Sequence, residues 1–272
     1  MSDRGYLWLA LVFYAISCLL SILRLRRSGP LPALRRFTAI AMICGVGLHT
    51  VFLFARGNSI GRCPLTNPFE TTVFITWAAA LFYILIGSSY RVSFLGEFTA
   101  PLVLIINFVA LSELNDTLRP PPLQPVPWMV DAHKPISVLA FGAFALACVA
   151  GGMYLVQERQ LKNRHLSPSF LLMPSIEQLD VINFRLMVLG FGMLTVGMIG
   201  GMISYRIVGH WTKPKIVWAV GVWLLYALVL LARRVWSLRG RKIALVSMFS
   251  FGFVLVTFWG VSMVSSVQGG PP

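Results

Sequence analysis

The sequence predicts an all-α integral membrane protein, a bundle of about eight transmembrane helices. The chain of 272 residues is 57% hydrophobic and only 12% charged, whereas charged residues make up about 25% of a typical soluble domain. Its apolar stretches are long and continuous and lack the alternation of barrel strands. Only helices and closed barrels satisfy the backbone hydrogen bonds in lipid, so the continuous stretches favour helices.

Eight apolar segments are long enough to cross a membrane, since a transmembrane helix needs roughly 20 mainly apolar residues. They are residues 5–23, 37–55, 69–87, 94–114, 136–156, 184–205, 216–232 and 243–264. We expect residues 1–272 to form a single polytopic membrane domain. The first segment is not followed by a small-residue cleavage site, so we expect it to remain as a span rather than be removed as a signal peptide.

An even number of spans puts both termini on one side of the membrane, and the basic residues predict which side. Fifteen of the 23 lysine and arginine residues fall on one side and eight on the other. Because loops rich in these residues stay in the cytoplasm, we expect both termini on the outer side. The short basic loops also explain the formal net charge of +14. They would contact anionic lipid of the bilayer, and without a recognised nucleic-acid-binding motif we predict no nucleic-acid partner.

Local patterns predict helix starts and helix contacts. Ser175 followed by Gln178 is a capping-box pattern, which predicts a helix start at this point. Asn67 before a proline predicts the start of the third span in the same way, as a cap with proline at the first helical position. Gly197 and Gly201 form a small-xxx-small pair, which is typical of closely packed membrane helices.

Three of the four histidines fall near the predicted outer face. His49 follows Ala41 and Gly45 at spacings of four, so a neighbouring helix can approach closely and His49 should point into the bundle. It lies about two turns from the outer end of its span, where an ionisable group usually has a function or a specific partner. His133 opens the fifth span, and His210 lies in the loop after the sixth.

Haem fits these residues. Imidazole nitrogen is an axial ligand of haem iron, and we predict His49 and His133 as the ligands. The chain has no C-x-x-C-H motif for covalent attachment, so the predicted cofactor is non-covalent haem b. The other predicted contacts are His210, the ring walls Trp211 and Trp218, and the propionate partners Arg206 and Lys215.

Other interpretations remain open. Zinc could be bound by the three histidines with a water or with Cys63, and His49 with Glu97 could form a proton relay. Each histidine also fits a structural role, as a buried neutral ring, a cap or an exposed loop residue. No H-E-x-x-H motif, nucleophile or acid–base pair is visible in the sequence, so we do not expect an enzyme.

Several stretches together resemble the cytochrome c assembly family of membrane proteins, which includes CcsA-like and ResC-like proteins and a HemX-like branch. They are residues 61–77, His133 at the start of the fifth span, 154–162, 174–180 and 189–201. The resemblance covers most of the chain, and His49 makes it closest to the HemX-like branch. It implies a multi-pass protein of the bacterial inner membrane that supports cytochrome c biogenesis, with haem and other assembly components as partners.

The chain departs from the family pattern in the loop that cradles haem. Family members carry roughly W-G-x-Y-W-x-W-D-P-K-E-x-W, whereas residues 209–218 read GHWTKPKIVW. Pro214, Lys215 and Trp218 match, but two acidic positions and two family histidines are missing. We therefore expect a haem-handling accessory rather than an enzyme that attaches haem. The alternative is a HemX-like, non-catalytic regulator that docks a cytoplasmic haem-biosynthesis enzyme through the basic loop 157–180.

Overall fold

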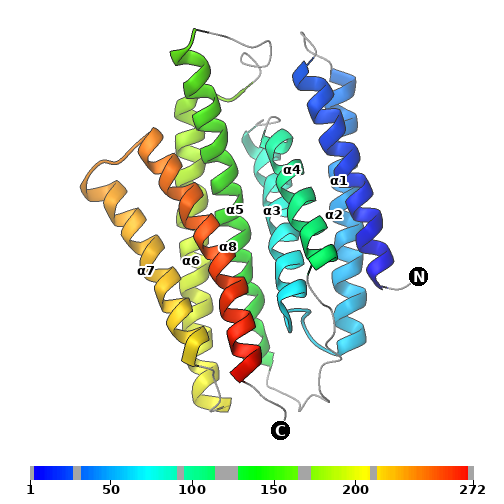
Figure 1. Cartoon of the computed structure of the whole chain (residues 1–272), viewed down its shortest axis with the longest axis vertical. Helices are drawn as coiled ribbons and strands as arrows, with labels where there is room; N and C mark the ends of the chain where they lie inside the picture. Colours follow the sequence, from blue (N-terminus) through cyan, green and yellow to red (C-terminus); the bar gives the residue numbers. More distant parts are fainter. Residues whose placement is uncertain are drawn as a thin grey trace.

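The computed structural model describes residues 3–26, 32–90, 95–113, 128–164, 173–208 and 213–268. These residues form eight α-helices and no strand (Figure 1). The helices are α1 (Asp3–Arg26), α2 (Pro32–Ile60), α3 (Pro68–Tyr90), α4 (Leu95–Glu113), α5 (Trp128–Lys162), α6 (Ile176–Val208), α7 (Lys213–Val235) and α8 (Arg241–Gln268). Among the described residues, these eight are all long and apolar enough to cross a membrane, which agrees with the predicted bundle of about eight helices.

Several helices continue past the apolar segments that predicted them. Helix α2 runs on to Ile60, and α5 extends from Trp128 to Lys162. Hydropathy marks only the part of a helix that lies in hydrocarbon, whereas polar turns in the headgroup region keep their helical hydrogen bonds. The predicted loop 157–180 is accordingly shorter than expected at its start, because α5 continues to Lys162, whereas α6 begins at Ile176, where the capping box predicted a helix start.

The helix ends define two faces of the bundle. We call one the terminal face, where α1, α3, α5 and α7 begin and α2, α4, α6 and α8 end. The opposite end is the basic face, with Arg24 near the end of α1 and Arg233 and Arg234 in the last turn of α7. Figure 1 shows the start of α1 and the end of α8 at the same end of the molecule. That the terminal face points outward remains a prediction.

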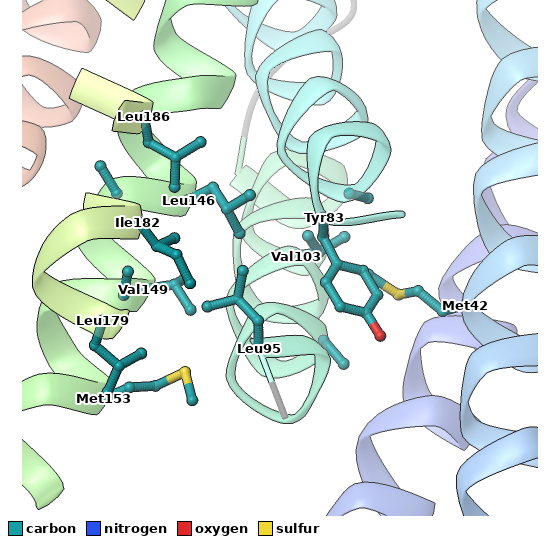
Figure 2. Close-up of a cluster of buried hydrophobic side chains, with 14 of the residues drawn as sticks. Met42, Tyr83, Leu95, Val103, Leu146, Val149, Met153, Leu179, Ile182 and Leu186 are labelled. Carbon is teal, nitrogen blue, oxygen red and sulfur yellow. The ribbon is translucent and has the colours of Figure 1, made fainter. Parts of the chain in front are cut away.

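Helix α5 lies at the centre, packed against α3, α6 and α8. Helices α1 and α2 form a pair that packs on α4 and α3, and α7 lies at the outside against α6 and α8 (Figure 1). Apolar side chains of α2, α3 and α4 meet those of α5 and α6 in the core near the basic face. Figure 2 shows Leu146, Val149 and Met153 of α5 and Leu179, Ile182 and Leu186 of α6 beside Leu95 and Val103 of α4, with Tyr83 and Met42 beyond.

Tryptophan and threonine pairs join neighbouring helices. In four places among the described residues an indole N–H donates to a threonine hydroxyl of another helix, and that threonine donates to a carbonyl one turn earlier. The N···O distances are 2.9 Å for Trp77 and Thr50, 2.9 Å for Trp218 and Thr257, 3.0 Å for Trp223 and Thr195, and 3.1 Å for Trp259 and Thr72. Since lipid offers no water to these polar groups, each pair stabilises one arrangement of two helices.

Buried and half-buried ion pairs also link distant parts of the chain. At the terminal face, Arg56 of α2 donates to Asp3 of α1 and to Glu70 of α3, each at 2.8 Å. Near the basic face, Arg24 of α1 pairs with Glu97 of α4. Removing one partner of such a pair leaves an uncompensated buried charge, so these contacts hold α1, α2, α3 and α4 in one arrangement.

The predicted helix caps are confirmed. The backbone N–H of Ser175 donates to the Gln178 side chain at 3.1 Å, and the Gln178 N–H donates to Ser175 Oγ at 3.2 Å. The Glu70 N–H donates to Asn67 Oδ1 at 2.7 Å, just before α3 begins. Both capping residues satisfy N–H groups that the first helical turn leaves without a partner.

Candidate functional site

His49 of α2 is buried against α1 and α3. Its side chain is fully enclosed, and Nδ1 lies 3.1 Å from the Tyr14 hydroxyl of α1. Gly45, one turn earlier, makes room for the Tyr14 ring, because a Cβ there would lie 2.7 Å from it. The inward orientation of His49 is therefore as predicted. Its position is 11 residues, about 16 Å along the helix, before the end of α2.

The surroundings of the His49 ring are mostly apolar. The Phe52 ring centroid lies 6.3 Å away, and the ring lies close to the Val73 backbone of α3. Nε2 nevertheless has no well-formed hydrogen bond among the described residues. A buried ring with one unsatisfied nitrogen has a donor or acceptor to offer to a ligand, but its enclosure leaves no open side for one.

His133 lies between α5 and α6, close to the terminal face. It was expected to open the fifth span, and it belongs to the second turn of α5, which begins at Trp128. Its Nδ1 is 3.2 Å from Ser204 Oγ of α6. A Cβ on Gly200 would lie 2.9 Å from the His133 Cβ, so the two backbones approach closely here because Gly200 has no side chain.

His49 and His133 have different described neighbours. The ring of His49 contacts side chains of α1 and α2 and lies close to the Val73 backbone of α3, whereas the described hydrogen bond of the His133 ring is to Ser204 of α6. Among the described residues no three histidine, cysteine or acidic side chains gather as a metal site would require. Glu97 lies near the basic face, paired with Arg24, and no described hydrogen bond joins it to His49.

Trp218 of α7 lies among aromatic rings of α5 and α8. Its ring centroid is 5.8 Å from that of Phe141 on α5 and 5.6 Å from that of Phe258 on α8. Its N–H donates to Thr257. Trp218 thus belongs to an aromatic cluster between α5, α7 and α8, in the terminal half of the bundle.

The remaining predicted contacts sit at the junction of α6 and α7. His210 and Trp211 lie outside the described residues, as do the side chains of Arg206 and Lys215. The backbones of Arg206 and Lys215 belong to the last turn of α6 and the first turn of α7. Ser204, the partner of His133, lies four residues before α6 ends, about 6 Å along the helix. Residues 209–212 follow the end of α6 in the sequence and lie outside the described residues.

Sequence reasoning missed several residues that shape this region. Ser204 and Tyr14, which contact the two histidine rings, carry no motif. Arg56, a cation near the terminal face, pairs with Asp3 and Glu70. The only sequence signal for Ser204 is its place four residues after Gly200, on the face that approaches α5.

Comparison with known proteins decides the family. Residues 65–267 match the family described as "Cytochrome C assembly protein". The chain belongs to this family. The matched segment covers α3 to α7 and nearly all of α8, including His133, Trp218 and the 209–212 junction. Helices α1 and α2, and with them His49, precede it.

Individual relatives agree with the family assignment. The chain is 28% identical over 254 residues to "Cytochrome c biogenesis protein CcsA" of Chlorella vulgaris, covering 79% of each chain. It is 29% identical over 269 residues to the CcsA protein of Thermosynechococcus vestitus, covering 83% of this chain and 82% of that one. With the Chlamydomonas reinhardtii CcsA protein, identity is 25% over 227 residues, covering 80% of this chain and 63% of the relative.

These findings confirm the predicted family and a role in cytochrome c biogenesis for this multi-pass membrane protein. The relatives named above are CcsA proteins, so they support the assembly prediction and not the regulator alternative. They come from algae and from a cyanobacterium. The family assignment therefore does not by itself specify the bacterial inner membrane.

Proposed function

We propose that this protein holds non-covalent haem b near its terminal face during cytochrome c assembly, with His133 as an axial ligand of the iron. The observation that carries the proposal is the setting of His133. Its Nδ1 lies 3.2 Å from Oγ of Ser204, which belongs to the C-terminal part of α6, and both residues are within the family-matched segment. A ligand held by a second side chain is oriented before the metal arrives.

The described residues fit the chemistry of haem. Imidazole supplies a nitrogen ligand. The aromatic cluster between α5, α7 and α8, formed by Trp218, Phe141 and Phe258, supplies apolar surface. We propose Arg206 and Lys215, whose backbones belong to the end of α6 and the start of α7, as the cations that propionates require. When bound, haem would provide the iron porphyrin that cytochrome c assembly consumes, while this chain would bind it, orient it and limit its contact with water.

The second axial ligand has two candidates. His49 was the predicted partner, but its ring lies among α1, α2 and α3, and haem bound there would contact a different set of helices. His210 belongs to the α6–α7 junction, directly beyond the helix that contacts His133. We therefore propose His210, rather than the predicted His49, as the companion of His133.

The proposal includes an orientation and a location. The terminal face would point outward from a bacterial inner membrane, because the basic face carries the larger share of lysine and arginine. Other assembly components would meet the protein on this outer side.

The test is an absorption spectrum of the protein purified in mild detergent from cells supplied with haem precursor. We expect a Soret band and, after reduction, the sharp α and β bands of a six-coordinate haem. A haem-free preparation that also fails to take up added haemin would overturn the proposal. Variants with alanine at His210 or His49 then identify the second ligand, since loss of that ligand changes a six-coordinate spectrum to a five-coordinate one.

A further inference from the structure

We infer that Ser204 is a positioning residue for haem, which acts by fixing the tautomer of the His133 ring. The inference rests on the proposed role of His133 as an iron ligand. It goes beyond that role because it assigns the ring nitrogen that faces the iron and the side chain that selects it.

The hydrogen bonds of Ser204 decide the tautomer. Its hydroxyl has one proton, and it donates that proton to the Gly200 carbonyl at 2.8 Å. The longer contact, 3.2 Å to His133 Nδ1, must therefore have Nδ1 as the donor and Ser204 Oγ as the acceptor. In a neutral ring with hydrogen on Nδ1, the lone pair is on Nε2, so Nε2 is the nitrogen able to bind iron.

The close packing of α5 and α6 keeps this contact in place. Gly200 lets the backbone of His133 approach, and Gly197 does the same for Ser137, where a Cβ would lie 2.0 Å from the Ser137 hydroxyl. Ser204 is 1% exposed, so water does not compete for its oxygen. Ser204 Oγ thus has a fixed position on α6 relative to the His133 ring.

Ser137 supplies a matched control. Its hydroxyl donates to the backbone carbonyl of His133 at 2.9 Å, so it contacts the same residue without touching the ring. Ser137→Ala and Ser204→Ala each remove one oxygen from the α5–α6 contact. A general loosening of the helix pair would affect both variants alike, whereas a tautomer effect belongs to Ser204 alone.

The first experiment needs no haem. Nitrogen NMR of histidine-labelled protein in lipid nanodiscs reports which ring nitrogen carries hydrogen, and His133→Gln identifies the signal. We expect hydrogen on Nδ1 in the wild type and in Ser137→Ala, and a shift toward hydrogen on Nε2 in Ser204→Ala, since a free imidazole prefers that form. Hydrogen on Nε2 in the wild type, or an unchanged signal in Ser204→Ala, would overturn the inference.

The second experiment measures haemin binding to the same proteins. Loss of a partner that orients a metal ligand typically weakens metal affinity by about 10–100-fold. We expect a loss of that size in Ser204→Ala, at least partial recovery in Ser204→Thr, which keeps the hydroxyl, and no change in Ser137→Ala. Equal haemin affinity in Ser204→Ala and wild type, with binding lost in His133→Ala, would reject the role of Ser204 and leave the proposed function standing.

Failure of the proposed function gives a different result. If the wild-type protein binds no haemin, the assignment of His133 as a ligand is wrong, and the positioning role of Ser204 fails with it. The NMR spectra would still establish whether the Ser204 hydrogen bond selects the tautomer.

Discussion

Replacement of Gly197 by alanine tests the close approach of α5 and α6 that the candidate site depends on. An added Cβ would lie 2.0 Å from the Ser137 hydroxyl oxygen and 3.0 Å from both its Cα and Cβ atoms. The hydroxyl can rotate away, but the contacts to Cα and Cβ can be relieved only by moving a helix. Overpacking of this kind costs about 1–3 kcal/mol.

Gly192 on the same helix provides the control. A Cβ added there meets no atom within 4 Å. Alanine favours a helix by about 1 kcal/mol over glycine at either position, so that contribution cancels when the two variants are compared. Gly197→Ala should therefore be about 1–3 kcal/mol less stable than Gly192→Ala, and Gly192→Ala should be at least as stable as the wild type.

Unfolding by SDS in mixed micelles, followed by tryptophan fluorescence, measures this difference. Both variants are compared with the wild type at the same detergent composition. If the two alanine variants unfold at the same SDS fraction, α5 and α6 are not packed as described and the setting of His133 must be revised.

Two further predictions concern buried charge and orientation. Arg56→Ala leaves the buried Glu70 carboxylate without its arginine, and breaking such a pair lowers the stability by about 3–5 kcal/mol. The control is Lys162→Ala, which removes an exposed pair. In the same unfolding assay it should lower the stability by about 1 kcal/mol or less. A small effect of Arg56→Ala would mean that the pair is solvated. In a protein without its native cysteines, Ser59→Cys at the terminal face should react with an impermeant thiol reagent added outside intact cells, and Arg239→Cys at the basic face should not. The reverse pattern would invert the proposed orientation.

Features set by local sequence were predictable. Each span follows from about 20 apolar residues, the starts of α3 and α6 follow from Asn67 and Ser175, and the inward direction of His49 follows from Gly45 one turn earlier. These depend on helical periodicity and on hydrogen bonds within one turn, which are determined by neighbours in the chain. Helix lengths were less predictable, since hydropathy does not detect turns beyond the hydrocarbon.

Lateral neighbours were not predictable. Charge and hydropathy place a residue at a depth and on a side of the membrane, but they do not say which helices touch. His49 and His133 were therefore expected to converge, although their rings contact different helices. Arg56 meets Asp3 across 53 positions in the chain, and Ser204 meets His133 across 71. No local pattern specifies such pairs, because they arise from the packing of whole helices.

Haemin titration of purified wild type, His133→Ala and His49→Ala tests the central claim most directly. We expect the wild type to bind haem with a six-coordinate spectrum, His133→Ala to lose that spectrum and most of its affinity, and added imidazole to restore part of both. His49→Ala should keep the wild-type spectrum if His210 is the second ligand. A His133→Ala protein that binds haemin with the wild-type spectrum and affinity would contradict the account.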